Sequence, residues 1–380
     1  MIERADVMVG PRGRRLCLEI AAALARASGA PEGDEYLRAA LVAAYHLDPG
    51  AGTARVILRA SADEPDEPDP SPRPADVARL LSATPLDGLD ADVLLVGLRA
   101  AVDNARYWQE PDGEDVLAAT PQVRAALARV AATVASSGRA AWWVSPVERT
   151  AQASVVFDDP ASPVQPSDET ASVILSRWRD RTLEEEARAQ RERPADPGAA
   201  WSGTWWSTPP RELTRTTRRL GAHGPVGLWL VEDAYGWDRA SVRAVDVPAE
   251  ARVYEVDGAE AWSGLCRRFP LEVTASRRHD WFRTTGAADR WVIPDWVRVA
   301  DEFDAVHVTV TGYLTTAGRP VPVGEDTSSV LAGWSPDETY WLADPPPAAE
   351  PHERWRRVDD DTWHDEGMHD RGGGLRAGAG

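Results

Sequence analysis

The sequence predicts an α+β protein in which a helical N-terminal domain precedes a tryptophan-rich, mostly antiparallel α+β domain. Helical spacing of apolar residues dominates the first 195 residues, whereas short strand-like runs alternate with two helical patterns in residues 196–343. Eleven of the seventeen tryptophans lie between Trp201 and Trp341. Because a tryptophan buries a large ring and needs an acceptor for its N–H, this density predicts an aromatic core or an aromatic-lined ligand surface.

The first 60 residues predict a helical segment. Apolar positions repeat at helical spacing in residues 13–26 and 34–47, and residues 54–58 are typical of a short strand. Residues 61–75, where proline alternates with acidic residues, bury too little to fold and predict a linker or loop. A length of 380 residues agrees with two folded units plus linkers.

Residues 76–195 predict a mainly helical unit with short strands. We expect strands at residues 141–144 and 153–157, and helices at 76–81, 91–108, 121–135 and from Ser167 or Asp168 to 193. The last helix is almost wholly charged from Glu184 onward. This charge run predicts a solvated helix or a spacer between domains in preference to a partner-binding helix.

Residues 196–343 predict the tryptophan-rich domain, and residues 344–380 predict a disordered acidic tail. Helices are expected at 259–269 and 295–303. Strands are expected at 226–231, 241–245, 251–256, 290–293, 305–311 and 339–342.

The charge of the chain limits its classes of partner. A formal net charge of −19 argues against general binding to nucleic acids or anionic membranes, which requires a basic face. No window holds eighteen uninterrupted apolar residues, and the N-terminus lacks the pattern of a secretory signal, so we expect a cytoplasmic protein without a membrane span. Cys17 and Cys266 lie in apolar helical patterns, which favours structural free thiols.

Two clusters of arginines stand out within this acidic chain. The chain contains no lysine, so its 42 basic residues are all arginine, and a single arginine is weak evidence for arginine-specific chemistry. One cluster spans residues 211–219 and the other residues 267–283. Guanidinium groups bind phosphate or carboxylate bidentately, and a neighbouring indole offers a face to a flat ring. We therefore predict a ligand site formed by Trp205, Trp206, Arg215, Arg218, Arg277, Arg278, Trp281 and Arg283. The alternative is that these arginines cover apolar surface and pair with acidic neighbours.

Three further features have a functional and a structural interpretation. His279, among arginines, is a general-base candidate because like charge disfavours its protonated form, whereas His307 in a strand-like run is more typical of a satisfied core histidine. Arg12, Arg14 and Arg15 stand at a helix start, where an anion site or a solvated helix start is expected, and the GK[ST] ending of a P-loop is absent. No metal-binding motif is present, and no cofactor is assigned.

The pair Ser207–Thr208 after an aromatic run, together with Glu338 in "SPDETYW", resembles the pattern of ADP-ribosyltransferases. The resemblance implies transfer of ADP-ribose from a nicotinamide dinucleotide, with Ser207, Thr208 and Glu338 in the pocket. It covers isolated residues only: Pro336 replaces the first member of the paired Glu/Gln-x-Glu signature, and no upstream arginine is identifiable. Segments such as "RRHDWFRTTG" and "WVIPDW" also resemble an uncharacterised protein family of GC-rich bacteria, which implies no function.

The leading hypothesis is binding: the second domain holds an anionic or aromatic ligand, or a protein partner, between its arginine-rich loops and tryptophans. The alternative is an enzyme similar to ADP-ribosyltransferases, which requires Ser207, Glu338 and both arginine clusters to share one face of the domain. Ligand binding requires only that the clusters converge.

Overall fold

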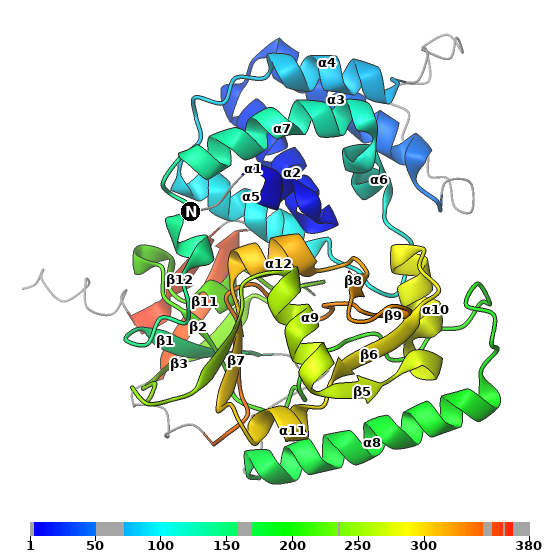
Figure 1. Cartoon of the computed structure of the whole chain (residues 1–380). Helices are drawn as coiled ribbons and strands as arrows, with labels where there is room; N and C mark the ends of the chain where they lie inside the picture. Colours follow the sequence, from blue (N-terminus) through cyan, green and yellow to red (C-terminus); the bar gives the residue numbers. More distant parts are fainter. Residues whose placement is uncertain are drawn as a thin grey trace, which may run out of the picture.

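The chain folds into a layer of helices packed above a part built on two β-sheets, so the fold class is α+β (Figure 1). The structure, a computed structural model, describes residues 4–50, 72–158, 169–234, 236–344, 352–359 and 362–367. The strand expected at 54–58 and most of the linker expected at 61–75 lie outside these residues.

The helical layer is organised around the second helix, whose apolar stripe Leu16, Ile20 and Leu24 is buried. Four of these helices begin with proline, whose fixed φ suits the first helical position. The layer comprises α1 (Arg4–Val9), α2 (Pro11–Ser28), α3 (Pro31–Leu47), α4 (Pro74–Ala83), α5 (Ala91–Asp103), α6 (Gly113–Ala119) and α7 (Pro121–Ser136).

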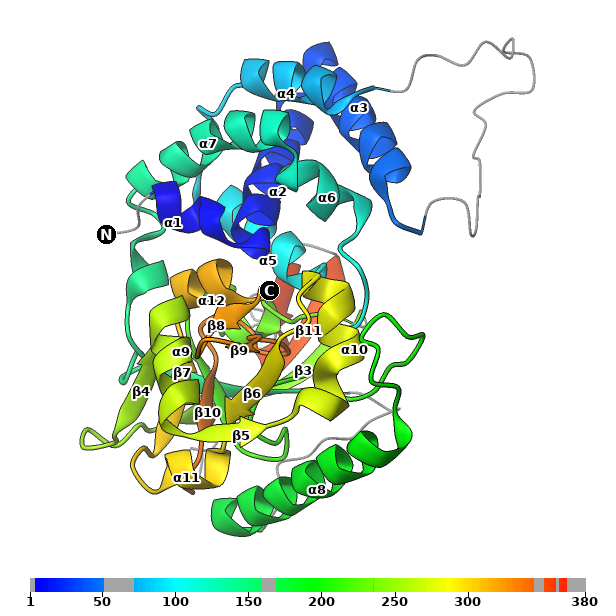
Figure 2. The same ribbon diagram turned by 45° about the vertical axis from the view of Figure 1, so that its right-hand side comes forward.

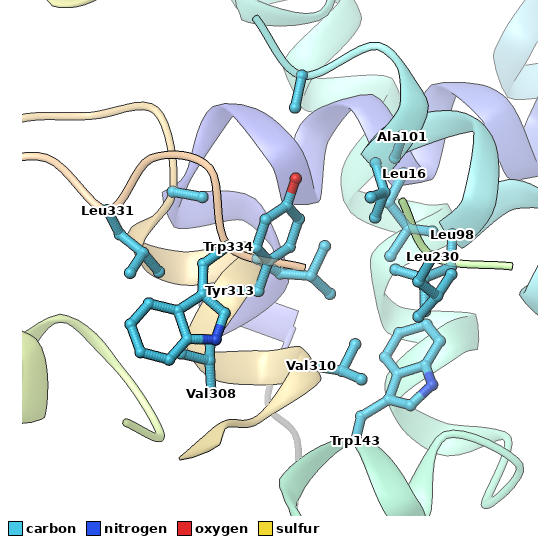
Figure 3. Close-up of a cluster of buried hydrophobic side chains, with 14 of the residues drawn as sticks. Leu16, Leu98, Ala101, Trp143, Leu230, Val308, Val310, Tyr313, Leu331 and Trp334 are labelled. Atoms are coloured by element: carbon cyan, nitrogen blue, oxygen red, sulfur yellow. The ribbon is translucent and has the colours of Figure 1, made fainter. Parts of the chain in front are cut away.

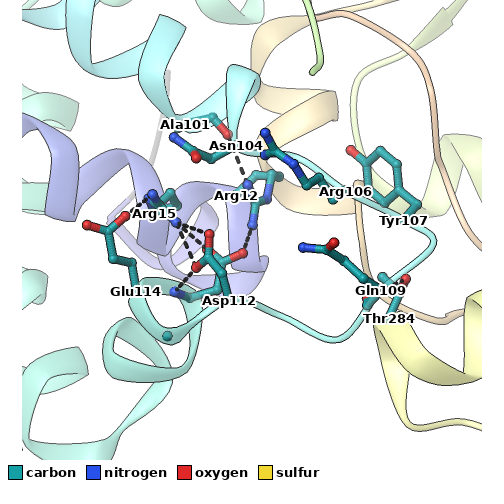
Figure 4. Close-up of polar contacts among 12 residues, drawn as sticks. Arg12, Arg15, Ala101, Asn104, Arg106, Tyr107, Gln109, Asp112, Glu114 and Thr284 are labelled. Atoms are coloured by element: carbon teal, nitrogen blue, oxygen red, sulfur yellow. Dashed lines mark hydrogen bonds and ion pairs between the residues drawn. The ribbon is translucent and has the colours of Figure 1, made fainter. Parts of the chain in front are cut away.

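Two buried arginines of α2 join this helix to α6, as Figure 4 shows. Arg15 donates to Asp112 at 3.0 Å and also pairs with Glu114, while Arg12 pairs with Asp115. Their side chains are 2% and 5% exposed. Since a buried charge requires a paired and hydrogen-bonded partner, these arginines stabilise the helical layer and are not directed at an external anion.

The larger sheet is antiparallel apart from its β4–β7 pair and has the order β12-β11-β3-β1-β2-β10-β7-β4. Its strands are β1 (Gln152–Phe157), β2 (Arg215–Arg218), β3 (Arg239–Val245), β4 (Val253–Val256), β7 (Ala305–Val308), β10 (Thr339–Trp341), β11 (Glu353–Asp359) and β12 (Thr362–Asp365). The smaller sheet has the order β5-β6-β9-β8, from β5 (Pro270–Glu272), β6 (Arg290–Pro294), β8 (Val321–Pro322) and β9 (Thr327–Ser329).

The longest helix, α8 (Ala171–Glu192), lies on the side of the sheet part opposite the helical layer and packs on α10 (Thr274–Thr285) and α11 (Trp296–Ala300) (Figures 1 and 2). Its charge run predicts a solvated helix or spacer, yet one face is buried. The carboxylate of Glu186 accepts from the backbone N–H groups of Ala275 and Ser276 at 2.9 and 2.8 Å. It therefore satisfies two free donors of the first turn of α10.

A continuous apolar core joins the helical layer to the sheet part. Figure 3 shows Leu16 and Leu98 of the helical layer in the same cluster as Tyr313 of α12 (Val310–Thr316). The sequence assigns β1 and α8 to the helical unit, but β1 pairs with β2 and β3 of the larger sheet. Spacing patterns identify an element without identifying its pairing partner.

Three local predictions differ from the structure. The strands expected at 141–144 and 226–231 are short 3-10 turns, η1 (Ala141–Val144) and η3 (Val226–Leu228), because short apolar runs do not distinguish the two conformations. The tail expected to be disordered contains β11 and β12, which extend the larger sheet through β3 and bury Trp355 and Trp363. Acidic flanks obscured these strands in the sequence. Two helical elements complete the described part: the α-helix α9 (Ala259–Arg268) and the 3-10 turn η2 (Gly221–His223).

We predict that Gly10→Ala loosens the contact between the helical layer and α12. A Cβ on Gly10 would lie 2.3 Å from the carbonyl oxygen of Leu314, and a backbone atom cannot move as the end of a side chain can. Overpacking of this kind costs about 1–3 kcal/mol. The free energy of unfolding in urea measures the loss.

The matched control is Gly264→Ala in α9, where the nearest atom would be the Tyr254 hydroxyl at 3.5 Å. This variant should be as stable as the wild type or more stable, by up to about 1 kcal/mol, because alanine favours helix. Equal stability of the two variants would contradict the proposed role of Gly10.

Candidate functional site

A cavity of about 990 Å³ lies on one face of the larger sheet, over β1 and β2. Its floor includes Val155 and Phe157 of β1 and Arg215 of β2. The segments 202–217 and 227–237 form its walls, and Trp108 enters from the chain that follows α5. The volume is in the range of small-molecule sites.

The alternation of side chains along β2 determines which arginines face the cavity. Arg215 lines it, whereas Arg218 turns to the opposite face of the sheet. There Arg218 Nε donates to Asp337 Oδ1 at 2.5 Å, and its guanidinium also reaches the carbonyl oxygen of Pro146 at 3.0 Å. Arg218 therefore ties the sheet to the chain that leads from the helical layer.

Aromatic rings form one wall of the cavity. The ring centroids of Trp108 and Trp205 are 4.8 Å apart, and those of Trp205 and Trp206 are 5.1 Å apart in an edge-to-face arrangement. The guanidinium of Arg211 lies 5.3 Å from the centre of the Trp206 ring. Such a wall presents π faces to a flat ligand and a cation beside them.

The polar part of the cavity contains an ion pair between Arg215 and Glu338, with Nη1 and Oε1 3.1 Å apart. The Arg215 side chain is 38% exposed, so it remains accessible from the cavity, while Glu338 is 9% exposed. Burial raises the pKa of Glu338, and Arg215 opposes this shift. Within the described ranges, Arg211 has no carboxylate partner.

Glu232 places a second carboxyl group in the cavity wall. Burial raises its pKa to about 8, although the hydroxyls of Tyr107 and Tyr313 and the charge of Arg12 oppose the shift. Tyr107 donates a hydrogen bond to its Oε1 atom. Glu232 is largely neutral at pH 7, and Asp233 pairs with Arg106 outside the lining. Glu338 pairs with Arg215, so Arg211 is left without an ion pair among the described residues.

No sequence pattern indicated Glu232 as a site residue. It lies in an ordinary polar stretch, "VEDAYGW", and its burial depends on Tyr107 and Tyr313, which are distant in the chain. Trp108 was not predicted as a cavity residue either, because its neighbours in the cavity are also distant in the chain.

A second cavity of about 300 Å³ adjoins the first, with Trp206 and Arg211 lining both. It lies beneath α8, and Arg277 of α10 is part of its lining. One arginine from each predicted cluster, Arg211 and Arg277, therefore meets here.

The other residues of the predicted ligand site contact protein groups. Trp281 is fully buried and donates from its indole N–H to the carbonyl oxygen of Trp205 at 2.7 Å. Arg278 donates to the carbonyl oxygen of Ala195 at 3.1 Å, and Arg283 donates to the carbonyl oxygens of Trp108 and Trp201 at 2.9 and 2.7 Å. Trp281 and Arg283 thus hold the backbone of the aromatic wall, whereas Arg278 contacts the chain that follows α8.

The catalytic candidates are not all brought together. Glu338 lines the first cavity, but Ser207 is fully buried, and its hydroxyl accepts from the backbone N–H of Ala332 at 3.0 Å. Thr208 is 2% exposed. His279 is 1% exposed on α10, where burial and then Arg278 lower its pKa.

His307 belongs to a buried network on the other face of the sheet. Its Nδ1 atom lies 2.6 Å from Glu255 Oε2, and its Nε2 atom lies 3.5 Å from Asp337 Oδ1. Burial lowers its pKa, but the two carboxylates outweigh burial and raise it overall. The network holds β7 to β4 and to the turn before β10.

The remaining chemistry of the described part is structural. Both cysteines are free and buried, and burial raises the pKa of each thiol to about 12. Among the residues that the structure places, no three His, Cys, Asp or Glu side chains gather as metal ligands, and no helix has the length and apolarity to cross a membrane.

Comparison with known proteins adds no assignment. No family model matches the chain, and no curated protein or solved structure is significantly similar to it.

We predict that Glu232→Gln removes a pH dependence of stability. The folded chain keeps a proton on Glu232 up to about pH 8, whereas the unfolded chain releases it near the ordinary glutamate pKa of 4.5. Stability from this group is therefore greatest below pH 4.5 and falls as pH rises to about 8, by on the order of 3–5 kcal/mol.

Chemical denaturation at pH 5 and pH 8 measures the difference. The Gln variant should lose less stability than the wild type over this interval. Glu353→Gln, which removes a partly exposed carboxylate paired with Arg219, serves as the control and should keep the wild-type fall between the two pH values. An unchanged pH dependence in Glu232→Gln would show that this carboxyl group is ionised in the folded chain.

Proposed function

We propose that the chain binds a small anionic ligand with a flat ring in the 990 Å³ cavity. The observation that carries the proposal is the combination of three tryptophans in tilted and edge-to-face contact with an arginine that has no carboxylate partner in the described part. An aromatic wall binds a flat ring with little loss of side-chain entropy, and an accessible guanidinium binds an anionic group.

Arg215 contributes a second guanidinium to this ligand. Its partner Glu338 is buried while Arg215 is partly exposed, so the exposed nitrogens of Arg215 face the cavity. The ion pair fixes the orientation of the guanidinium, which lowers the entropy cost of binding.

A second candidate function is cleavage of the bond between nicotinamide and ribose in a nicotinamide dinucleotide, with transfer of ADP-ribose. It is supported by Glu338, which lines the aromatic cavity next to Arg215. Ser207 and Thr208 are buried behind the wall and Arg218 lies on the opposite face of the sheet, so the arrangement that the ADP-ribosyltransferase resemblance requires is not met. The proposed chemistry therefore involves Glu338 alone of the three residues. Its carboxylate would stabilise positive charge that develops on the ribose when nicotinamide leaves.

We predict that flat anionic compounds bind and change tryptophan fluorescence. A panel of paired nucleosides and nucleoside monophosphates serves as probe, with affinity measured by calorimetry. Trp206→Leu should weaken binding about 5- to 100-fold, the range expected for loss of one stacking partner. Trp201→Leu alters an indole that is 41% exposed and outside the lining, so it should leave affinity unchanged. Absence of binding by every member of the panel, or equal effects of the two substitutions, contradicts the proposal.

We predict, for the second candidate, slow release of nicotinamide from NAD by the wild-type chain. Glu338→Gln keeps the shape of the side chain but removes its charge, so it should lower the rate of nicotinamide release from saturating NAD at least tenfold. Liquid chromatography measures the released nicotinamide. Equal rates in both proteins rule out a catalytic role for Glu338, and binding of NAD without any release leaves the binding function alone.

A further inference from the structure

The second cavity contains an excess of guanidinium groups. Its lining includes Arg181 of α8, Arg277 of α10 and Arg211, which is shared with the first cavity. In the described ranges neither Arg181 nor Arg211 has a carboxylate partner. A further arginine in the lining, Arg177, is already paired with Glu169 at 2.7 Å. The lining also includes Glu185 and Glu212, so four guanidinium groups face two carboxylates within it and positive charge is in excess.

Arg277 is the buried member of this set. It is 3% exposed, and its only carboxylate contact within the described residues is Glu185, 3.4 Å from its Nη1 atom. Its Nε atom is buried without a hydrogen-bond partner. Burial lowers the pKa of the Arg277 guanidinium more than Glu185 raises it. A buried guanidinium with an unsatisfied donor is costly unless a ligand completes its contacts.

The negative charge of Glu185 is shared between Arg277 and other groups. Its carboxylate also accepts from Arg193 at 3.1 Å and from the Thr204 hydroxyl at 2.8 Å. Burial raises its pKa, but Arg277, Thr204 and Arg193 outweigh burial and lower it, so the group is ionised at neutral pH. One carboxylate thus serves two guanidinium groups.

We propose that this second cavity binds a phosphate group of the ligand, through Arg277, Arg211 and Arg181, while the ring of the ligand stacks in the first cavity. The inference rests on the proposed binding function and names its substrate class, a phosphorylated ring compound. A volume of about 300 Å³ accommodates a phosphate or pyrophosphate group with water. Trp206 and Arg211 form the shared wall, so one ligand reaches both cavities.

Phosphate chemistry fits this geometry better than carboxylate chemistry. A phosphate has three accessible oxygens and accepts from several guanidinium groups at once, whereas a carboxylate has two. The cavity presents guanidinium groups from α8, from α10 and from the segment before β2. This convergence from three elements matches a tetrahedral anion.

The test compares nucleosides with their monophosphates, and adds inorganic pyrophosphate as a probe without a ring. In the wild type, the phosphate should increase affinity at least tenfold. Arg277→Gln should remove this gain and leave nucleoside affinity unchanged. Arg278→Gln is the matched control, since Arg278 also has a buried Nε atom without a hydrogen-bond partner but lies outside both cavities and donates to the carbonyl oxygen of Ala195.

Two further variants complement Arg277→Gln, and the first, at an exposed residue, leaves no buried guanidinium unpaired and so guards against a folding defect. Arg181→Gln changes an exposed side chain and should lower phosphate affinity about threefold or more with stability unchanged. Glu185→Gln removes the competing carboxylate and should raise phosphate affinity. A purely structural role for Arg277 predicts no such opposite effects.

The outcomes separate the two proposals. If nucleosides bind and their phosphates add nothing, the phosphate site is wrong and the proposed function stands. If no nucleoside binds but pyrophosphate binds and is lost in Arg277→Gln, the phosphate site stands and the ring site is wrong. Binding of neither probe overturns both.

Discussion

The structure depends on buried and partly buried arginines that are paired with a limited number of carboxylates. Arg15 with Asp112 joins α2 to α6, Arg218 with Asp337 joins β2 to the turn before β10, and Arg193 with Glu185 joins the end of α8 to its own preceding turns. Removing one partner of such a pair leaves an uncompensated charge and costs several kcal/mol, about 3–5. The pairs therefore specify which elements meet.

The limited number of carboxylates also explains where the candidate site lies. Arginines at the joints have partners, whereas Arg211 and Arg181 have none in the described part of the chain and both line cavities. Other exposed arginines of the described part, among them Arg124, Arg139 and Arg188, also have no carboxylate partner there. Arg211 and Arg181 differ from them because they line cavities, and Arg211 also lies beside a tryptophan ring.

Local patterns predicted much of the helical structure, because an apolar stripe and a capping residue lie within one segment. The helix expected at 13–26 is α2, and that expected at 121–135 is α7. Strand pairing was not predictable in this way. Gln152 pairs with Val245 across ninety-three residues, and the order of strands depends on such long-range contacts. The described part of the tail became strand because β3 offers it an edge.

Only part of the site could be predicted, because charge clustering does not show which face of a strand each side chain occupies. A cluster at 211–219 looks like one basic surface in sequence, but residues 215–218 form a strand and their side chains alternate between two faces. Arg215 thus reaches the cavity with Trp205, Trp206 and Glu338, while Arg218 binds Asp337 on the opposite face. Without the strand assignment, charge clustering alone overestimates the number of ligand contacts.

Arg211 couples the two cavities physically. Its guanidinium lies over the Trp206 ring, and both side chains line both spaces. A ring that stacks near Trp206 restricts the rotamers of Arg211, and an anion that binds Arg211 restricts the same rotamers from the other side. The entropy cost of ordering this side chain is then incurred once for two contacts. A ligand that occupies both cavities also binds its second group at a high effective concentration, because the first group already holds it in place. A single ligand with a ring and an anionic group therefore suits this arrangement better than two separate ligands.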